Sequence, residues 1–357
     1  MIAYARTAAL LAALWGLALL LDESVVIAAA ISLALVATHA AIVLTRRRRE
    51  RRNAAALIRG LRAQAESQLS FTRPDLIDEI GAMAEQFMGA VETLRSSHLG
   101  KQGSEALYAI PWYMIIGPPG SGKTTALRNS GLNFPLQAPQ AGIRGFAGTR
   151  NCEWWLTNDG VLIDTAGRYT ADDDHDEWLA FLDLLRSYRP RRPIEGVLVG
   201  VAVDDLGGIG EEQIVDRARQ IRARINEVMK RLQVVTPVYV LFTKCDLIPG
   251  FVELFGPMTR SQRAEIWGFT FPVEQRGALG ARFVECFARL TDAVEAHALR
   301  KLIDQRSVTG RARVACFGEQ LRALGPNLGL FVNTLFTDNV YQETPILRGV
   351  YFTSGTQ

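Results

Sequence analysis

The stretch WYMIIGPPGSGKT, residues 112–124, decides the fold of this 357-residue chain. Its first five residues are apolar, as in a buried strand, and its last eight match the G-x-x-x-x-G-K-[ST] phosphate loop. The residues that follow, Thr125–Arg128, begin a helix. A buried strand, a glycine-rich loop and a helix in this order predict an α/β domain with a mostly parallel sheet and a site for polyphosphate.

Each residue type of the loop has a physical task in holding a nucleoside triphosphate. Glycines permit positive φ angles, so that successive N–H groups point at phosphate oxygens near the helix N-terminus. Lys123 is expected to contact the β- and γ-phosphates as a catalytic residue, and the Thr124 hydroxyl to bind Mg²⁺. The predicted nucleotide-binding residues of the loop are Gly117, Gly120, Ser121, Gly122, Lys123, Thr124 and Thr125.

A second motif follows downstream in VLIDTAG, residues 161–167. Asp164 ends an apolar strand and is a predicted Mg²⁺ ligand, while the N–H of Gly167 is placed to sense the γ-phosphate. Thr149, in the preceding Gly-Thr-Arg segment, is our candidate for a switch threonine that closes on Mg²⁺. We therefore count Thr149 and Gly167 among the predicted catalytic residues.

The third motif is TKCD, residues 243–246, directly after the buried strand VYVLF. Lys244 is expected to lie over the base, and the Asp246 carboxylate to accept hydrogen bonds from guanine N1 and N2. The three motifs, each after an apolar strand, resemble the G domains of translation-factor-like and Ras-like GTPases over residues 112–271.

Two departures from that pattern leave the activity open. Arg168 stands where many hydrolytic G domains carry a water-orienting glutamine, so hydrolysis is expected to be slow or partner-dependent. Arg168, Arg144 and Arg150 are instead candidates for stabilising transition-state charge. No S-A-K element follows TKCD; residues 267–271 are expected to supply that strand without a base contact. The choice between ATP and GTP therefore stays open.

The N-terminal region predicts a membrane anchor. Residues 7–21 and 25–44 are apolar and are joined only by Asp-Glu-Ser, which favours a transmembrane helical hairpin over residues 1–45. A cleaved signal peptide is disfavoured because a second span follows at once. The run at residues 46–52 holds six arginines and one glutamate, which should stay cytoplasmic. Subtracting that +5 from the chain's +3 leaves −2, so no nucleic-acid partner is expected.

The remaining chain divides by its hydrophobic pattern. Residues 46–107 predict a cytoplasmic helical connector, residues 108–277 the G domain, and residues 278–357 a helical extension. The four cysteines have no CxxC or CxxH spacing, which disfavours zinc and redox chemistry.

Several segments taken together resemble the TssM/IcmF family of type VI secretion proteins. The resemblance is carried by PWYMIIG at 111–117, TRNCEWW at 149–155, DTAGRY at 164–169 and LRGVYFTSGTQ at 347–357. It implies a bacterial inner-membrane location, homo-oligomerisation, and assembly with a TssL-like membrane protein and with baseplate proteins. It also implies a third span and a periplasmic region beyond these residues, through which a TssJ-like lipoprotein would be contacted; the chain then resembles an N-terminal part of such a protein.

Three functional hypotheses follow from the sequence. In the first, the domain is a switch-like NTPase that uses Mg²⁺ with ATP or GTP. In the second, it is a structural scaffold with a static or absent nucleotide, as Arg168 and the missing S-A-K element suggest. In the third, outside the family, it is a membrane-anchored GTPase of another kind, which gives the LRGVYFTSGTQ segment no role.

Overall fold

The computed structural model describes residues 108–134, 152–165, 167, 175–263, 265–272, 279–339 and 341–355, and scattered helical residues between 29 and 90. The chain forms two compact units, residues 1–81 with 91–109 and residues 82–90 with 110–357. The predicted hairpin and the helical connector lie almost wholly outside the described residues. In the described part, no helix is both long and apolar enough to cross a bilayer.

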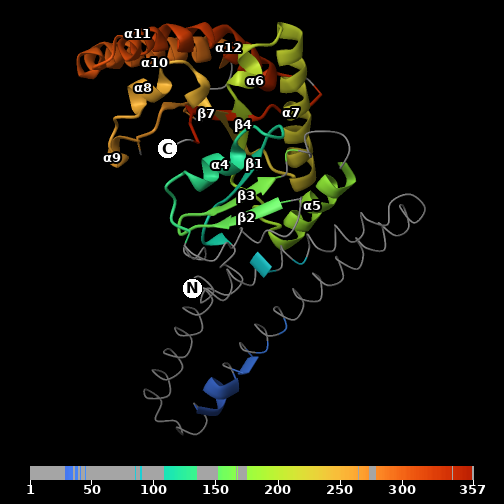
Figure 1. Cartoon of the computed structure of the whole chain (residues 1–357). Coiled ribbons are helices and arrows are strands. Elements are labelled where there is room, and N and C mark those ends of the chain that lie inside the picture. Colours follow the sequence, from blue (N-terminus) through green and yellow to red (C-terminus); the bar gives the residue numbers. More distant parts are fainter. Residues whose placement is uncertain are drawn as a thin grey trace. The chain divides into compact units, whose positions relative to one another are not determined.

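The second unit is built on one seven-stranded sheet in the order β2-β3-β1-β4-β5-β7-β6. Its strands are β1 Trp112–Ile116, β2 Cys152–Leu156, β3 Val161–Thr165, β4 Gly196–Ala202, β5 Pro237–Thr243, β6 Gly268–Thr270 and β7 Ile346–Phe352. The five inner strands are parallel, and β2 and β6 run antiparallel at the two edges (Figure 1). The predicted α/β class with a mostly parallel sheet is confirmed.

Helices surround this sheet. They are α4 Lys123–Arg128, α5 His175–Tyr188, α6 Asp204–Gly207, α7 Glu211–Leu232, α8 Phe251–Phe255, α9 Arg260–Arg263, α10 Leu279–Lys301, α11 Val308–Ala323 and α12 Gly325–Phe336. Two short 3-10 turns, η4 Cys245–Leu247 and η5 Leu302–Asp304, complete the described elements. Helix α7 packs against both α5 and α12, and α10 packs against α11 and α12.

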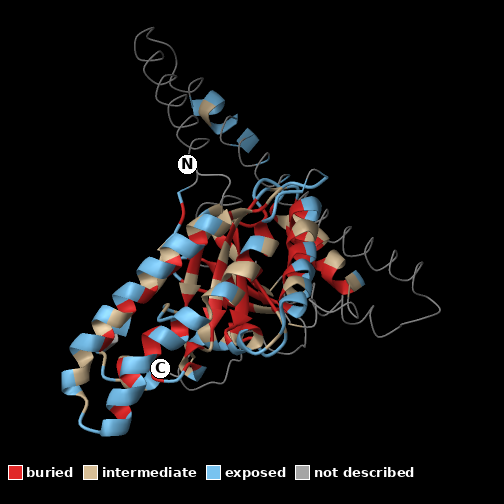
Figure 2. Ribbon diagram, turned by 90° about the horizontal axis from the view of Figure 1, so that it is seen from above, coloured by how far each residue is buried: buried red, intermediate tan, exposed pale blue. Residues whose placement is uncertain are grey.

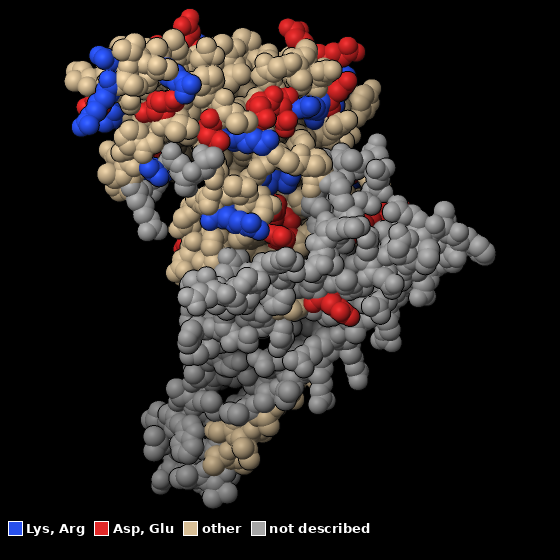
Figure 3. Space-filling model, viewed as in Figure 1, with Lys and Arg blue, Asp and Glu red and all other residues tan. Residues whose placement is uncertain are grey.

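Burial follows the predicted hydrophobic stripes. Figure 2 shows the buried residues gathered in the strands and on the inward faces of the helices. The stripe predicted for α7 is buried along its whole length, with no residue more than 2% exposed: Ile214, Ala218, Ile221, Ile225, Val228 and Leu232. On the face seen in Figure 3, acidic and basic side chains of the described part lie interspersed. Arg322 of α11, for example, pairs with Asp292 and Glu295 of α10.

The start of β1 is fixed by a buried charge. Arg189 is fully buried and its guanidinium lies 4.5 Å from the ring centroid of Trp112. Glu195 pairs with Arg189 at 3.1 Å and also accepts a hydrogen bond from the main-chain N–H of Trp112. Because a buried guanidinium needs its partner and its acceptors, this cluster holds β1, and hence the loop after it, in one position.

Residues 278–357 were predicted to be a helical extension, and the last part of this segment is a strand instead. Helices α10, α11 and α12 form as expected, but the chain then returns to the sheet as β7, between β5 and β6. Residues 267–271 were expected to supply the strand beside TKCD; β6 forms there, but it lies at the sheet edge and contacts β7. The physical reason is that β7 buries four of its seven residues, as an inner position requires, whereas β6 is short and buries none.

Candidate functional site

The carboxyl ends of the parallel strands bring the three motifs together. Strand β1 leads into the phosphate loop, β3 ends at Asp164 and Thr165, and β5 ends at Thr243. Because these strands are parallel, their carboxyl ends lie at one edge of the sheet, where open α/β folds bind ligands. A cavity of about 600 Å³ lies at this edge.

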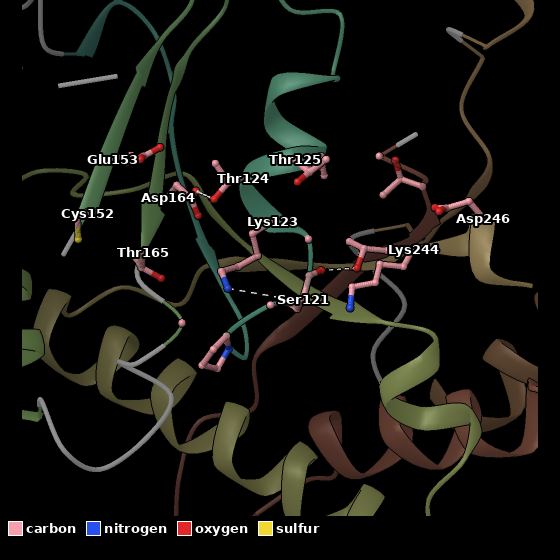
Figure 4. Close-up of a pocket in the computed structure, with 18 residues that line it drawn as sticks. Ser121, Lys123, Thr124, Thr125, Cys152, Glu153, Asp164, Thr165, Lys244 and Asp246 are labelled. Carbon is pink, nitrogen blue, oxygen red and sulfur yellow. Dashed lines mark hydrogen bonds between the residues drawn. The ribbon is translucent and has the colours of Figure 1, made fainter. Parts of the chain in front are cut away.

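The cavity is lined by residues from all three motifs and from the end of the chain (Figure 4). The lining residues are Pro119, Gly120, Ser121, Gly122, Lys123, Thr124, Thr125, Ala126, Cys152, Glu153, Asp164, Thr165, Gly167, Thr243, Lys244, Asp246, Thr353 and Gly355. Most of the predicted site is therefore brought together. Gly117 lies outside the lining, and Thr149, Arg144, Arg150 and Arg168 lie outside the described residues.

The phosphate loop has the backbone that its glycines predict. Positive φ angles occur at Gly117 (+151°), Gly120 (+72°) and Gly122 (+77°), and Gly122 is the N-cap of α4. A Cβ on Gly117 would lie 2.0 Å from the carbonyl oxygen of Gly200 on β4, so glycine is required there for close approach as well as for conformation. The loop therefore curls over the sheet edge directly before the helix.

The side chain of Lys123 folds back against the phosphate loop that precedes it. Its side chain is only 6% exposed, and Nζ donates hydrogen bonds to the carbonyl oxygens of Gly117 and Pro118, both at 2.8 Å. A third, longer contact of 3.4 Å reaches Ser121 Oγ. Burial lowers the pKa of Lys123, and the nearby Asp164 charge opposes that shift. The ammonium is thus held at the cavity by main-chain dipoles of the loop itself.

Asp164 has the chemistry of a magnesium ligand. It is 5% exposed, and Oδ2 accepts a hydrogen bond of 2.5 Å from Thr124 Oγ1. Its other oxygen, Oδ1, is buried and has no hydrogen-bond partner among the described residues. Oxygen ligands of this kind suit Mg²⁺, and an unpartnered buried carboxylate oxygen is costly unless a cation or donor meets it. The residues present therefore fit the predicted cation.

Glu153 of β2 was not predicted from the sequence. It pairs in register with Asp164 across the β2–β3 hairpin and lines the same cavity. Its Oε2 is buried and likewise has no partner in the described part of the chain. Figure 4 shows Glu153, Asp164 and Thr124 close together at one end of the cavity. The hairpin register places a second carboxylate there, and no local sequence signal would have revealed it.

Burial also disturbs the titration of Asp164. It raises the pKa of this carboxyl from 3.8 to about 6, although the Thr124 hydrogen bond and the Lys123 charge both lower it. The folded-state pKa lies above the unfolded one, so the folded protein loses stability as the pH rises from about 4 to about 6.

We predict that Asp164→Asn stabilises the Mg²⁺-free protein at pH 8. A shift of two units corresponds to roughly 3 kcal/mol, an upper figure, since each unit is worth about 1.4 kcal/mol. The gain should vanish below pH 4, where the wild-type carboxyl is already protonated. Thermal or denaturant unfolding at pH 4 and pH 8 measures it, with the exposed Asp159→Asn as control. A variant less stable than wild type at pH 8 would contradict this account.

The other end of the cavity carries the TKCD motif. Thr243 Oγ1 donates to the carbonyl oxygen of Ser121, which ties β5 to the phosphate loop. Lys244 adopts a left-handed backbone (φ 57°), and its Nζ lies 3.6 Å from Asp204 Oδ2. Asp246 Oδ1 accepts a hydrogen bond of 2.6 Å from Ser354 Oγ. Lys244 and Asp246 both line the cavity, at the end away from Asp164 (Figure 4).

Thr353 and Gly355 are lining residues that the sequence reasoning missed. They follow β7 directly, beside TKCD, where an S-A-K element was sought and not found. The available signal was the segment ILRGVYF, which is apolar apart from Arg348 and Gly349 and is followed by Thr-Ser-Gly. It was missed because a short apolar run does not reveal which strand it will join.

Comparison with known proteins shows the family of this chain. The family model described as the IcmF-related N-terminal domain matches residues 171–357, more than half of the 357-residue chain. The chain belongs to the TssM/IcmF family. A relative in this family is the type VI secretion system component TssM1 of Pseudomonas aeruginosa (strain PAO1), with 45% identity over 290 residues. The alignment covers 78% of this chain and 26% of TssM1, so the chain spans a minor part of that protein's length.

Two solved structures are also similar, but only distantly. One is a GTP-binding protein from the hyperthermophilic archaeon Sulfolobus solfataricus in complex with GDP, with 13% identity, covering 56% of this chain and 51% of that chain. The other is the complex of SsGBP with GDP, with 15% identity, covering 56% and 53%. Both give a TM-score of 0.23, too low to support any assignment of fold or ligand.

Proposed function

We propose that this chain belongs to an inner-membrane core component of the type VI secretion system and that its cytoplasmic domain binds a Mg²⁺–nucleoside triphosphate. The relative named TssM1 supports the first part. The second part is carried by the cavity at the sheet edge, where Lys123, Thr124 and the unpartnered oxygen of Asp164 line one space. Nucleotide binding would support assembly or switching of the secretion membrane complex.

Each residue has a role in this proposal. Main-chain N–H groups of Gly120–Thr124 and the Lys123 ammonium would hold the phosphates. Thr124 and Asp164 would hold Mg²⁺, whose charge offsets that of the β- and γ-phosphates. The N–H of Gly167 would sense the γ-phosphate, and Thr149 would close on the cation. Arg168 would offset transition-state charge, with hydrolysis slow because glutamine is absent at that position.

The proposal includes a place in the cell. The apolar hairpin, residues 1–45, would anchor the domain in the bacterial inner membrane, with the arginine run on the cytoplasmic side. Triphosphate would order the loops around Thr149 and Gly167 and thereby change how the domain meets a TssL-like protein, baseplate proteins or another copy of itself. A TssJ-like lipoprotein would be reached only by a periplasmic region outside these residues.

Calorimetry tests the proposal. Non-hydrolysable analogues of GTP and ATP are titrated into the detergent-purified chain with Mg²⁺ or with a chelator. We expect binding of at least one analogue, weakened about tenfold or more by the chelator or by Thr124→Ala, since a lost ligand costs on the order of 1–3 kcal/mol. Absence of heat with both analogues would favour a structural scaffold without nucleotide. An unchanged assembly of the secretion complex in cells that carry Lys123→Ala would also favour the structural scaffold.

A further inference from the structure

Helices α10 and α11 form a hairpin whose turn lies at its far end from the sheet (Figures 1 and 2). We call residues 299–311 the hairpin tip; they include the end of α10, all of η5 and the start of α11. The two helices pack against each other, and the last buried residue of α10 is Ala298 while the first of α11 is Gly310. Every residue between these two is half-buried or exposed.

Three large apolar side chains of the tip lie in solvent. Leu299 is 66% exposed, Ile303 is 89% exposed and Val308 is 77% exposed. No other ten consecutive residues in the described part of the second unit hold three such side chains. Single exposed apolar side chains are ordinary on a protein surface, whereas a group of them at a projecting end indicates a site of interaction.

Polar contacts hold the turn in place without these apolar side chains. Ser307 caps α11 by accepting a hydrogen bond of 2.9 Å from the Gly310 N–H. Gln305 Nε2 donates to the main-chain carbonyl of Glu253 in α8 at 2.9 Å. The usual arrangement is thus reversed, because polar side chains bond to the protein while apolar ones face water. The apolar side chains are therefore free to contact something outside this fold.

The tip is also basic. Its one acidic residue, Asp304, pairs with Lys301 at 3.0 Å, and nearby Arg313 pairs with Glu253 of α8 at 2.6 Å. Three arginines of the tip make no ion pair with any described residue, and with Lys301 they give the tip a net charge of +3: Arg300, Arg306 and Arg311. Figure 3 shows basic side chains gathered with uncharged ones at this end of the hairpin.

An anionic bilayer surface matches this combination of side chains. Apolar side chains at a projecting end can enter the headgroup region, and guanidinium groups beside them then meet lipid phosphates. The anionic lipid of a cytoplasmic leaflet attracts Lys and Arg near its surface. A nucleic acid would use the arginines but leave the apolar side chains in water. An acidic protein would have to offer an apolar groove and a negative rim together.

We propose that the hairpin tip is a second membrane contact of this domain. The three exposed apolar side chains insert among the headgroups of an anionic leaflet, and the three arginines without ion-pair partners bind the lipid phosphates. This inference rests on the proposed inner-membrane anchoring, which brings the domain to that leaflet, and it is independent of nucleotide. Two attachments to one bilayer would restrict how the domain turns about its anchor.

Lipid nanodiscs that hold the whole chain test this contact. With Cys286→Ser and Cys316→Ser only the two buried cysteines remain, and Ile303→Cys then carries a polarity-sensitive dye. The discs contain neutral phosphatidylcholine alone or with about 30% anionic phosphatidylglycerol. In anionic discs we expect a blue-shifted emission and roughly half the quenching by acrylamide, both reversed at about 1 M salt. A dye at Gln320→Cys, exposed on α11 away from the tip, should respond to neither lipid.

A charge variant tests the arginines. Removing the three arginines together should abolish the response of the dye to anionic discs, and the variant is Arg300→Gln, Arg306→Gln and Arg311→Gln. A matched control removes three exposed charges from α7 and should keep the response: Arg219→Gln, Lys230→Gln and Arg231→Gln. Equal responses of these two variants would overturn the proposed phosphate contact, because both change the net charge by the same amount.

An apolar variant tests insertion at unchanged charge. Leu299→Ser with Val308→Ser should lower the blue shift in anionic discs, since fewer apolar atoms leave water. A second measurement needs no dye. Hydrogen–deuterium exchange of the wild type should slow by about threefold or more in peptides covering residues 299–311 when anionic discs replace neutral ones. Unfolding temperatures of all variants show that the hairpin still folds.

The outcomes separate this inference from the proposal beneath it. If the chain fails to enter the discs, the proposed anchoring is wrong and the tip contact falls with it. If the chain enters the discs but the dye at position 303 stays in water with both lipids, the anchoring stands and the tip contact is overturned. The tip would then be a surface for a soluble partner.

Discussion

Replacing Lys123 by alanine is expected to weaken binding of the Mg²⁺–triphosphate analogues by at least about 100-fold, because a charge-assisted contact of this kind contributes on the order of 2–3 kcal/mol. Lys123 is the loop side chain whose ammonium lies within 2.8 Å of two main-chain carbonyls at the base of the cavity. Removing it leaves the phosphates without their fixed cation. Calorimetry on the variant measures the loss.

The control for this variant is Lys230→Ala. Lys230 is exposed on α7 and does not line the nucleotide cavity, so its removal changes net charge by the same amount without touching the site. Because Lys123 is buried, the unfolding temperatures of both variants are measured as well, so that a loss of binding is separated from a loss of folding. If Lys123→Ala binds the analogues as tightly as Lys230→Ala, the proposed phosphate contact does not exist.

Gly117→Ala is expected to destabilise the protein by about 3 kcal/mol or more, the sum of an unfavourable backbone conformation and a steric clash. Its φ of +151° is rarely adopted by residues with a side chain, and the new Cβ would stand 2.0 Å from the Gly200 carbonyl oxygen. The Gly200 carbonyl belongs to the backbone of the inner strand β4, so it cannot move aside as a flexible side chain would. Denaturant unfolding gives the measurement.

Gly208→Ala provides the matched comparison. A Cβ at Gly208 would have no neighbour within 4 Å, and its φ of −118° is open to any residue. That variant should unfold within about 0.5 kcal/mol of wild type, as surface changes without a special backbone usually do. A Gly117→Ala protein of equal stability to Gly208→Ala would mean that the loop does not pass against β4 as described.

Local motifs were enough to predict residues that lie together at the cavity. The phosphate loop, DTAG and TKCD each combine a buried strand with a short polar segment, and every such segment lies at the carboxyl end of its strand. Parallel pairing then brings them together without further information. The buried face of α7 could also be predicted, because its apolar residues recur every three to four positions, which is the period of one helix face.

Non-local pairing accounts for the parts that sequence reasoning missed. Strand β5 pairs with β4 on one side and with β7 on the other. In the described part of the chain, five α-helices (α8 to α12) and β6 separate β5 from β7, and no residue of the TKCD region indicates so distant a partner. The aromatic segment before α10 looked like the better strand, yet it forms the short edge strand β6. For the same reason the contact between Ser354 and Asp246 joins residues 108 positions apart.

The central claim is that main-chain amides of the phosphate loop and the Lys123 ammonium hold a polyphosphate. Hydrogen–deuterium exchange of the detergent-purified chain, with and without a saturating Mg²⁺–GTP analogue, tests it at the amides concerned. We predict slower exchange in peptides covering Gly120–Thr125, with protection lost in Lys123→Ala. Unchanged exchange across that loop at saturating analogue would contradict the account.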